Sequence, residues 1–444
     1  MLGFFHRMCD RHRARQFHRL GFADVELERL VEQFFEQRRW RHGRRWWNGR
    51  HRGQRVQFVE RGEQQFEQRI VGLRGNGRRW RNGRRWGNGR RWGNGGAGGM
   101  GGGPTGTLVA LAGPSAGGAY FEPATGWVAA PLNFSFHSAD ITPQMVGGAL
   151  AVMRRSSAVP AENNELFWTT WSKASGFTTP QQVGTFGFAK DGPAAAMAGV
   201  SVIMSFLGTD NKHYYAQNSD GNSFGAFGPI PAGMVQIQAF GPSATVLAAG
   251  GNAGAYAVYA GDDARLYYSY KSSPGGAWEP STQAPTSTVV NTIRPLALVD
   301  AAMDLRIVYV RQSDNRICTI KWITPQNSWT TEETIASAAT SKQPAAAEVV
   351  PGGDILIAYH GMLDEGIYFV RGNDGAFGSI TTVEVPAGTS SAPVVVRGLS
   401  GADAEIVYAA GNKLRHARVN GKAVMVGDVP GLTGVTTVTA TIAP

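Results

Sequence analysis

Six stretches of the chain carry aromatic and polar side chains at matching places, and a binding site could be built from these side chains. An aromatic ring can cover the apolar face of a sugar, while nearby polar groups fix the sugar hydroxyls. The stretches begin at Asn163, Asp210, Asp263, Asp314, Asp364 and Gly411. The candidate ligand-binding residues within them are Trp171, Tyr214, Gln217, Tyr267, Tyr270, Trp322, Tyr368 and Arg371.

The acidic residues and histidines predict structure rather than metal chemistry. An Asp in a tight turn accepts hydrogen bonds from amides that follow it, which stabilises a hairpin. Calcium needs six or more oxygen ligands from one place, more than one carboxylate per turn can supply. The histidines beyond residue 103 lie in separate units without metal-ligand spacing. We therefore expect no metal and no cofactor; these histidines are His137, His213, His360 and His416.

The sequence offers little support for catalysis. Sialidase-like hydrolysis would need an arginine cluster, a Tyr activated by a Glu, and an acid carboxylate. The arginines of the repeats do not recur at matching positions, so the sequence does not place three of them on one face of the fold. No serine elbow, Cys–His pair, phosphate loop or HExxH motif occurs. A glycan hydrolase is kept as the alternative, with Arg294, Arg306, Arg311, Arg371, Arg397, Glu333, Glu348 and Glu365 as its available residues.

Each of the six stretches predicts a short β-strand. Residues two apart share one face of a strand, so the fourth and sixth columns of the alignment should form a buried stripe. The fourth column holds Leu166, His213, Leu266, Ile317, Ile367 and Leu414, and the sixth holds Trp168, Tyr215, Tyr268, Thr319, Phe369 and His416. Phe167, Tyr214, Tyr267 and Tyr368 alternate away from this stripe.

Each predicted strand is accompanied by a glycine turn, an aromatic residue and a second apolar run, and the whole pattern recurs at regular intervals. A glycine turn and usually an aromatic residue follow each strand, spaced 47 to 54 residues apart by subtraction of positions. Another apolar run precedes each acidic turn, so one unit predicts four antiparallel strands in about 48 residues, the length of a propeller blade. These markers are Trp127, Phe177, Phe224, Trp278, Trp329, Phe377 and, in the last unit, Val424.

The repeats predict an all-β, seven-bladed β-propeller over residues 104–444. Gly117–Pro123 supplies a degenerate seventh copy of the strand. The first unit starts late, and one unpaired strand remains at the end of the chain, Thr436–Pro444. We expect this last strand to complete blade 1 as its innermost strand, because closing the ring removes exposed strand edges.

The first 103 residues have a different composition from the rest. They contain 24 arginines, nine acidic residues and no lysine, serine, threonine, proline or tyrosine, so they carry a net charge of +15. The remaining residues carry −5, although the whole chain is +10. The basic charge is therefore confined to the N-terminal segment, and we expect no nucleic-acid binding by the folded part.

We expect residues 1–103 to be a disordered tail and glycine-rich linker, with Val25–Phe35 able to form a short amphipathic helix. One interpretation of its Arg-Trp-Gly repeat, Arg78–Gly95, is a segment that binds phosphates and stacks on bases. The other is a mis-framed or wrongly started translation of a glycine-rich linker, because reading the probable codons one nucleotide later gives small residues. Peptide mass spectrometry of native material separates the two.

Cysteine content and hydropathy argue against a disulfide-stabilised fold and against a membrane-spanning protein. The two cysteines, Cys9 and Cys318, predict no disulfide framework. No stretch is long and apolar enough to span a membrane, and Met1–Leu30 lacks a signal-peptide pattern. Stability must therefore come from packing.

The repeats resemble the bacterial PLL-like β-propeller lectins, whose units carry a G-T-D-G-x-L-Y turn and strand followed by D-G-x-W-S-x-W. The matching stretches are GTDNKHYYAQNSDGNSFGAF, Gly208–Phe227, and AGDDARLYYSYKSSPGGAW, Ala260–Trp278. Ala226-Phe227 and Ser379-Ile380 stand where that family prefers a Trp. A weaker likeness to the Asp box of sialidases, with Ser219 in place of its Asp, concerns only a hairpin and carries no activity.

The resemblance implies carbohydrate binding between neighbouring blades, with fucose-like or O-methylated sugars as ligands and glycans as partners. Repeated sites would give multivalent binding through avidity. It also implies an extracellular or cell-surface location. Besides a lectin and a glycan hydrolase, a propeller that holds a protein partner on its loops is the third class. The oligomeric state does not follow from the sequence.

Overall fold

A computed structural model of the chain describes residues 46–51, 54–59 and 106–444. The last range has gaps at 115–116, 145–146, 158–163, 185–188, 232–245, 250–253, 287–289, 291–292, 300–303, 349–352, 374–375, 387 and 389. The chain divides into two units, Met1–Gly96 and Ala97–Pro444. In the first, β1 (Trp46–His51) and β2 (Gln54–Val59) form an antiparallel ribbon. The rest of our interpretation of the tail, including Val25–Phe35, lies outside the described residues.

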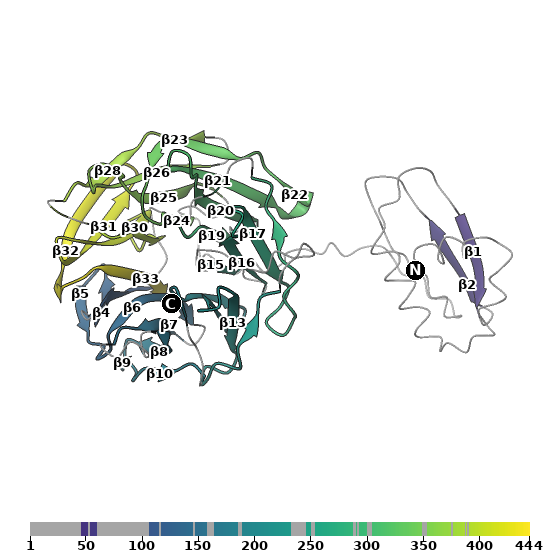
Figure 1. Ribbon diagram of the computed structural model, residues 1–444, viewed down its shortest axis with the longest axis horizontal. Coiled ribbons are helices and arrows are strands. Elements are labelled where there is room, and N and C mark those ends of the chain that lie inside the picture. The colour runs from purple at the N-terminus through teal and green to yellow at the C-terminus, as the bar shows by residue number, and fades with distance from the viewer. Residues whose placement is uncertain are drawn as a thin grey trace, which may run out of the picture. The chain divides into compact units, whose positions relative to one another are not determined.

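The second unit is a seven-bladed β-propeller, which confirms the predicted fold (Figure 1). Within the described residues the elements are strands and one short 3-10 helix, η3 (Thr324–Gln326). Each blade is an antiparallel sheet of four strands, and in three blades a further strand pairs with the third strand. Only blade 1 combines strands from the two ends of the domain.

The strands of blades 1 to 3 run from the innermost outward in the order in which they are named. Blade 1 consists of β33 (Thr437–Ala443), β3 (Thr107–Gly113), β4 (Gly117–Glu122) and β5 (Gly126–Ala130). Blade 2 consists of β6 (Phe136–Gln144), β7 (Gly148–Arg155), β8 (Leu166–Ser172) and β10 (Gln181–Gln182), with β9 (Gly176–Phe177) paired to β8. Blade 3 consists of β11 (Ala194–Ala198), β12 (Ser201–Leu207), β13 (His213–Asn218) and β14 (Gly228–Pro229).

Blades 4 to 7 follow the same order. Blade 4 consists of β15 (Val246–Ala249), β16 (Ala255–Ala260), β17 (Leu266–Lys271) and β18 (Thr282–Gln283). Blade 5 consists of β19 (Leu296–Val299), β20 (Leu305–Val310), β21 (Arg316–Ile323) and β22 (Ser328–Trp329), with β23 (Glu333–Ala339) paired to β21. Blade 6 consists of β24 (Ala345–Glu348), β25 (Ile355–His360), β26 (Ile367–Asn373) and β27 (Ala376–Phe377), with β28 (Thr381–Glu384) paired to β26. Blade 7 consists of β29 (Val394–Arg397), β30 (Ala404–Ala410), β31 (Lys413–Asn420) and β32 (Ala423–Thr433).

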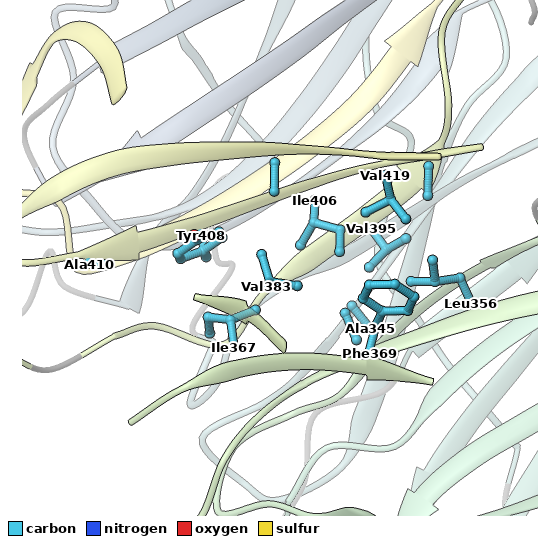
Figure 2. Close-up of a cluster of buried hydrophobic side chains, with 13 residues drawn as sticks. Ala345, Leu356, Ile367, Phe369, Val383, Val395, Ile406, Tyr408, Ala410 and Val419 are labelled. Atoms are coloured by element: carbon cyan, nitrogen blue, oxygen red, sulfur yellow. The ribbon is translucent and has the colours of Figure 1, made fainter. Parts of the chain in front are cut away.

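The core lies between the blades. Second strands such as β25 and β30 are buried along their whole length because a neighbouring blade covers each of their faces. One side of each third strand packs against the next blade, as where Val308 and Ile317 of blade 5 join Ile355 and Ile357 of blade 6. Figure 2 shows the cluster between blades 6 and 7, where Phe369 and Ile367 lie with Ile406 and Val419.

The predicted buried stripe is largely confirmed. All six residues of the fourth column are buried, as are Trp168, Thr319, Phe369 and His416 in the sixth column. Tyr215 and Tyr268 are only partly buried. Their rings meet Trp278 and Trp329 of the following blade at centroid distances of 5.7 and 5.3 Å.

The acidic turns are hairpin turns, as predicted. The carboxylates of Asp210, Asp263, Asp314 and Asp364 each accept a hydrogen bond from the backbone N–H two residues ahead, at 3.1 to 3.2 Å. The intervening residue adopts a left-handed conformation, with φ from 55° to 63°. The Asp side chain holds the turn closed around this costly conformation.

The C-terminal strand closes the ring, also as predicted. β33 pairs with β3 along its whole length, from Thr437 opposite Gly113 to Ala443 opposite Thr107. It also contacts β6 and β29, the innermost strands of blades 2 and 7. In Figure 1 the olive β33 lies beside the blue strands of blade 1.

Removing residues 437–444 should unfold much of the propeller, because blade 1 loses its innermost strand and blades 2 and 7 lose a neighbour. Loss of seven paired residues would consume much of the roughly 5–15 kcal/mol that stabilises a typical domain. Circular dichroism during heating measures the change. Deletion of the exposed Pro444 alone is the control and should leave the melting temperature unchanged. An unchanged melting temperature for the longer deletion would contradict the closure.

Stability should fall in acid through His213, which is fully buried against the ring of Tyr259 in the next blade. Burial lowers the pKa of His213 from 6.5 to about 3. The unfolded state therefore binds the extra proton first, and the contribution is lost as pH falls from about 6.5 towards 3.

Between pH 7.5 and pH 5 this histidine should cost the fold about 2 kcal/mol. Urea unfolding of the unaltered chain and of His213→Leu measures the difference, because Leu occupies the same column in three other blades. Equal pH dependence in both proteins would show that His213 is not the group responsible.

Candidate functional site: a polar cavity in blade 5

The predicted ligand residues lie near opposite ends of the third strands. Tyr214, Tyr267 and Tyr368 lie near the acidic turn, and each hydroxyl donates a hydrogen bond to the turn Asp. The Tyr214–Asp210 and Tyr267–Asp263 distances are 2.8 and 2.9 Å. These phenols therefore lock the hairpins.

The rings of these three tyrosines also stack on an aromatic residue of the second strand, at centroid distances of 5.6 to 5.8 Å. Burial raises the pKa of Tyr267 to about 12, and the hydrogen bond to Asp364 raises that of Tyr368 to about 12. The hydroxyls remain protonated donors at neutral pH. A ligand at these positions would compete with an internal hydrogen bond, and their role in binding stays a prediction.

The other predicted residues lie near the far end of the third strands, each with partners inside the fold. Trp171 is buried against Tyr120 of blade 1 at 5.4 Å. The amide nitrogen of Gln217 donates to Ser219 Oγ at 2.7 Å. Arg371 bridges two blades, because its guanidinium binds Asp354 at 3.0 Å and Asp403 of blade 7 at 2.7 Å.

The last two predicted residues, Tyr270 and Trp322, belong to the neighbouring blades 4 and 5. Tyr270 packs on Tyr256 at 4.7 Å, and Trp322 packs on Trp329 at 5.5 Å. Tyr256, Trp322 and Trp329 all pack against the hydrophobic cluster that joins these two blades. This interface is rich in aromatic rings, and they largely contact one another.

A cavity of about 490 Å³ lies in blade 5, on and around β21. It is lined by Arg306, Thr319, Ile320, Thr330, Thr331, Glu332, Glu333 and Thr334. Arg306 and Thr319 belong to the face that packs on blade 6, since they lie two residues from Val308 and Ile317. The outer wall is the segment leading into β23.

The cavity is lined mainly by hydrogen-bonding groups held by the sheet. Arg306 is 3% exposed, and its guanidinium nitrogen Nη1 lies 3.5 Å from Thr319 Oγ1. The Thr330 hydroxyl accepts a hydrogen bond from the Lys321 backbone at 3.0 Å, which fixes the outer wall against β21. Donors and acceptors for a hydroxyl-rich ligand are therefore already ordered.

A buried ion pair lies beside Arg306 in the same sheet, where Lys321 of β21 is opposite Arg306 of β20. Lys321 lies 3.2 Å from Asp304, and both side chains are almost fully buried. Asp304 also accepts a hydrogen bond at 2.8 Å from the backbone of Thr324, the first residue of η3. Asp304 neutralises the charge of Lys321. The charged residues that line the cavity itself are Arg306, Glu332 and Glu333.

Sequence reasoning did not assign this cavity. Arg306 and Glu333 entered only as residues available to a hydrolase, and Thr319 only as part of the buried stripe. One available signal was an arginine inside the otherwise apolar run LRIVYV, Leu305–Val310. The other was a threonine in a column that elsewhere is mostly aromatic.

A second polar cluster joins blades 7 and 1. The Glu405 carboxylate, fully buried, lies 2.8 Å from His416 Nε2 and 3.2 Å from Arg418 Nε. Trp127 of blade 1 donates its indole N–H to His416 Nδ1 at 3.1 Å. Each of these groups has a partner within the fold, so the cluster acts as a joint between blades. Among the described residues no group of three or more His, Cys, Asp or Glu side chains could hold a metal.

Comparison with known proteins identifies the fold. Neither a known protein family nor a curated protein matches the sequence. The BP39L lectin from Burkholderia pseudomallei is 12% identical, with a TM-score of 0.59 over 72% of this chain and 94% of that chain. A fungal lectin from Aleuria aurantia, a six-bladed β-propeller with a novel fucose recognition mode, is 15% identical, with a TM-score of 0.45 over 68% of this chain and 99% of that chain. The first likeness shows that this chain and the Burkholderia lectin share a fold.

Asp263→Ala should destabilise the propeller by about 1 kcal/mol, because it leaves the Tyr267 hydroxyl and a turn amide without their acceptor. Urea unfolding followed by tryptophan fluorescence measures this change. The control is Asp262→Ala at the exposed neighbouring position, which should stay within about 0.5 kcal/mol of the unaltered protein. Equal effects of the two substitutions would refute the role given to Asp263.

Proposed function

We propose that this propeller is a non-enzymatic carbohydrate-binding protein and that the blade 5 cavity is its binding site. The observation that carries the proposal is the cavity lining, which combines an ordered guanidinium with four threonines and two glutamates. A cavity of about 490 Å³ is within the range that holds small ligands. The resemblance to PLL-like lectins supports the same function.

The charges of the cavity favour a neutral sugar. The lining holds Arg306, Glu332 and Glu333, and a second arginine, Arg311, donates a hydrogen bond to the lining residue Thr334 at 3.3 Å, so charges of both signs lie at this place. A neutral sugar needs no counter-charge, and its hydroxyls can donate to the carboxylates and accept from Arg306. Fucose-like and O-methylated sugars are neutral and meet this requirement.

The finer parts of the proposal concern where and how the protein acts. Exposed glycans are the partners, and an extracellular or cell-surface location follows from a lectin function. The structure has no helix that could span a membrane among its described residues. A hydrolase or a protein-binding propeller would be revealed by the experiments that follow.

A glycan array probed with the full chain should show binding to neutral glycans with terminal fucose or O-methylated sugars. Thr331→Trp should reduce this signal at least about tenfold, because the indole fills the mouth of the cavity. Ser379→Trp is the matched control, since this exposed residue precedes β28 as Thr331 precedes β23, and it should bind normally.

Two outcomes would overturn the proposal. Binding to no glycan on the array would exclude the carbohydrate function and favour a protein partner. Release of fluorophore from fluorogenic fucosides or sialosides, abolished by Thr331→Trp, would show that the cavity is a hydrolase site.

A further inference from the structure

The innermost strands of the blades contact one another in ring order. β33 of blade 1 contacts β6, β6 contacts β11, and each following blade continues the series until β29 contacts β33. Figure 1 shows these strands around the centre of the ring. A structure of repeated units is held together mainly by contacts between neighbouring units. A side chain that joins blades further apart therefore adds a connection that the repeat itself does not supply.

Arg294 joins two blades that are not neighbours. It lies two residues before β19 of blade 5, and its guanidinium nitrogen Nη2 donates a hydrogen bond at 3.3 Å to the carbonyl oxygen of Pro193, one residue before β11 of blade 3. Blade 4, with β15 as its innermost strand, lies between blades 3 and 5. Gly192 keeps this place clear, since a Cβ on it would lie 2.9 Å from Ser138 Oγ and 3.9 Å from Arg294 Nη1.

The carboxylate of Asp140, in the innermost strand of blade 2, binds the innermost strands on both sides. Its oxygen Oδ2 accepts a hydrogen bond at 2.8 Å from the backbone N–H of Ala195 in β11. Its oxygen Oδ1 accepts one at 3.3 Å from the hydroxyl of Thr439 in β33, and one at 2.9 Å from the backbone N–H of Ile141. Since β33 is the closing strand, this one side chain ties it to blades 2 and 3.

Asp140 and Arg294 also interact through their charges. Burial raises the pKa of Asp140 and lowers the pKa of Arg294, and in each case the charge of the other residue is the main influence that opposes burial. Asp191, in the loop before β11, is a second acidic residue beside Arg294. A buried carboxylate is costly without a positive charge nearby. Arg294 therefore stabilises the ionised form of Asp140, and with it the hydrogen bonds to Ala195 and Thr439.

We infer that Asp140 and Arg294 form a latch at the centre of the ring that holds the closing strand β33 in place. Asp140 binds the strand through Thr439, and Arg294, which comes from blade 5 and is held on blade 3, compensates the charge of Asp140. The latch acts in addition to the pairing of β33 with β3. It involves no residue that lines the blade 5 cavity, so its test is independent of the proposed function.

The first test is the rescue of one substitution by a second. Arg294→Met should lower the melting temperature of the full chain at pH 8 by at least about 4 °C, because it leaves the Asp140 carboxylate without its compensating charge. Adding Asp140→Asn should recover at least about half of this loss, since the neutral amide needs no counter-charge and its oxygen still accepts hydrogen bonds. Losses that add in the double variant, or no loss for Arg294→Met, would overturn the inference.

The second test follows the closing strand itself by hydrogen–deuterium exchange and mass spectrometry. Asp140→Ala and Arg294→Met should each speed the exchange of residues 437–443 at least about tenfold, because local opening of the strand then costs less free energy. Residues 355–360, which form β25 of blade 6, should exchange as they do in the unaltered protein.

Asp220→Ala is the matched control for this exchange experiment. Asp220 also accepts hydrogen bonds from backbone N–H groups, those of Asn222 and Ser223 at 2.9 and 3.2 Å, but it lies in the turn after β13 of blade 3. Its replacement should leave the exchange of residues 437–443 unchanged. Equal acceleration there by Asp220→Ala, or no acceleration by Asp140→Ala, would contradict the latch.

Discussion

The packing of each blade against its neighbour is the constraint on which the rest of the structure depends. A single four-stranded sheet has two apolar faces and cannot bury either alone, so a blade is stable only between two others. This explains why second strands are buried along their length and why the ring must close through β33. It also limits binding sites, because space between blades is normally occupied by core side chains.

Many polar side chains in this fold also stabilise the blades and the contacts between them. The turn carboxylates hold hairpins, Arg371 ties blade 6 to blade 7, and Glu405 with His416 joins blade 7 to blade 1. Their charges are compensated within the protein. The blade 5 cavity differs because its polar groups line a space large enough for a ligand. That contrast makes the cavity the best-supported site among the described residues.

The fold could be predicted from sequence because the signals are local and repeated. The acidic turn, the alternating strand and the marker aromatic each reflect a local geometry, and seven copies at a regular spacing leave one architecture. The pairing of the C-terminal strand with blade 1 could be predicted because the first unit lacks one strand and the last residues supply one extra strand. Tyr215 and Tyr268, expected to be buried, are only partly so, although their rings meet Trp278 and Trp329 of the next blade.

The site was harder to predict because it depends on contacts across blades. Tyr214 and Tyr267 have the composition of ligand residues, but only the structure shows that their hydroxyls bind Asp210 and Asp263. The cavity is formed where β21 meets Thr330–Thr334, and threonines and glutamates in a loop are a weak signal in one sequence.

A crystal structure of the full chain soaked with methyl α-L-fucoside tests the central claim most directly. The account predicts density for a sugar in the blade 5 cavity, with its hydroxyls near Arg306 and Thr331. Density between Tyr270 and Trp322 instead would contradict it.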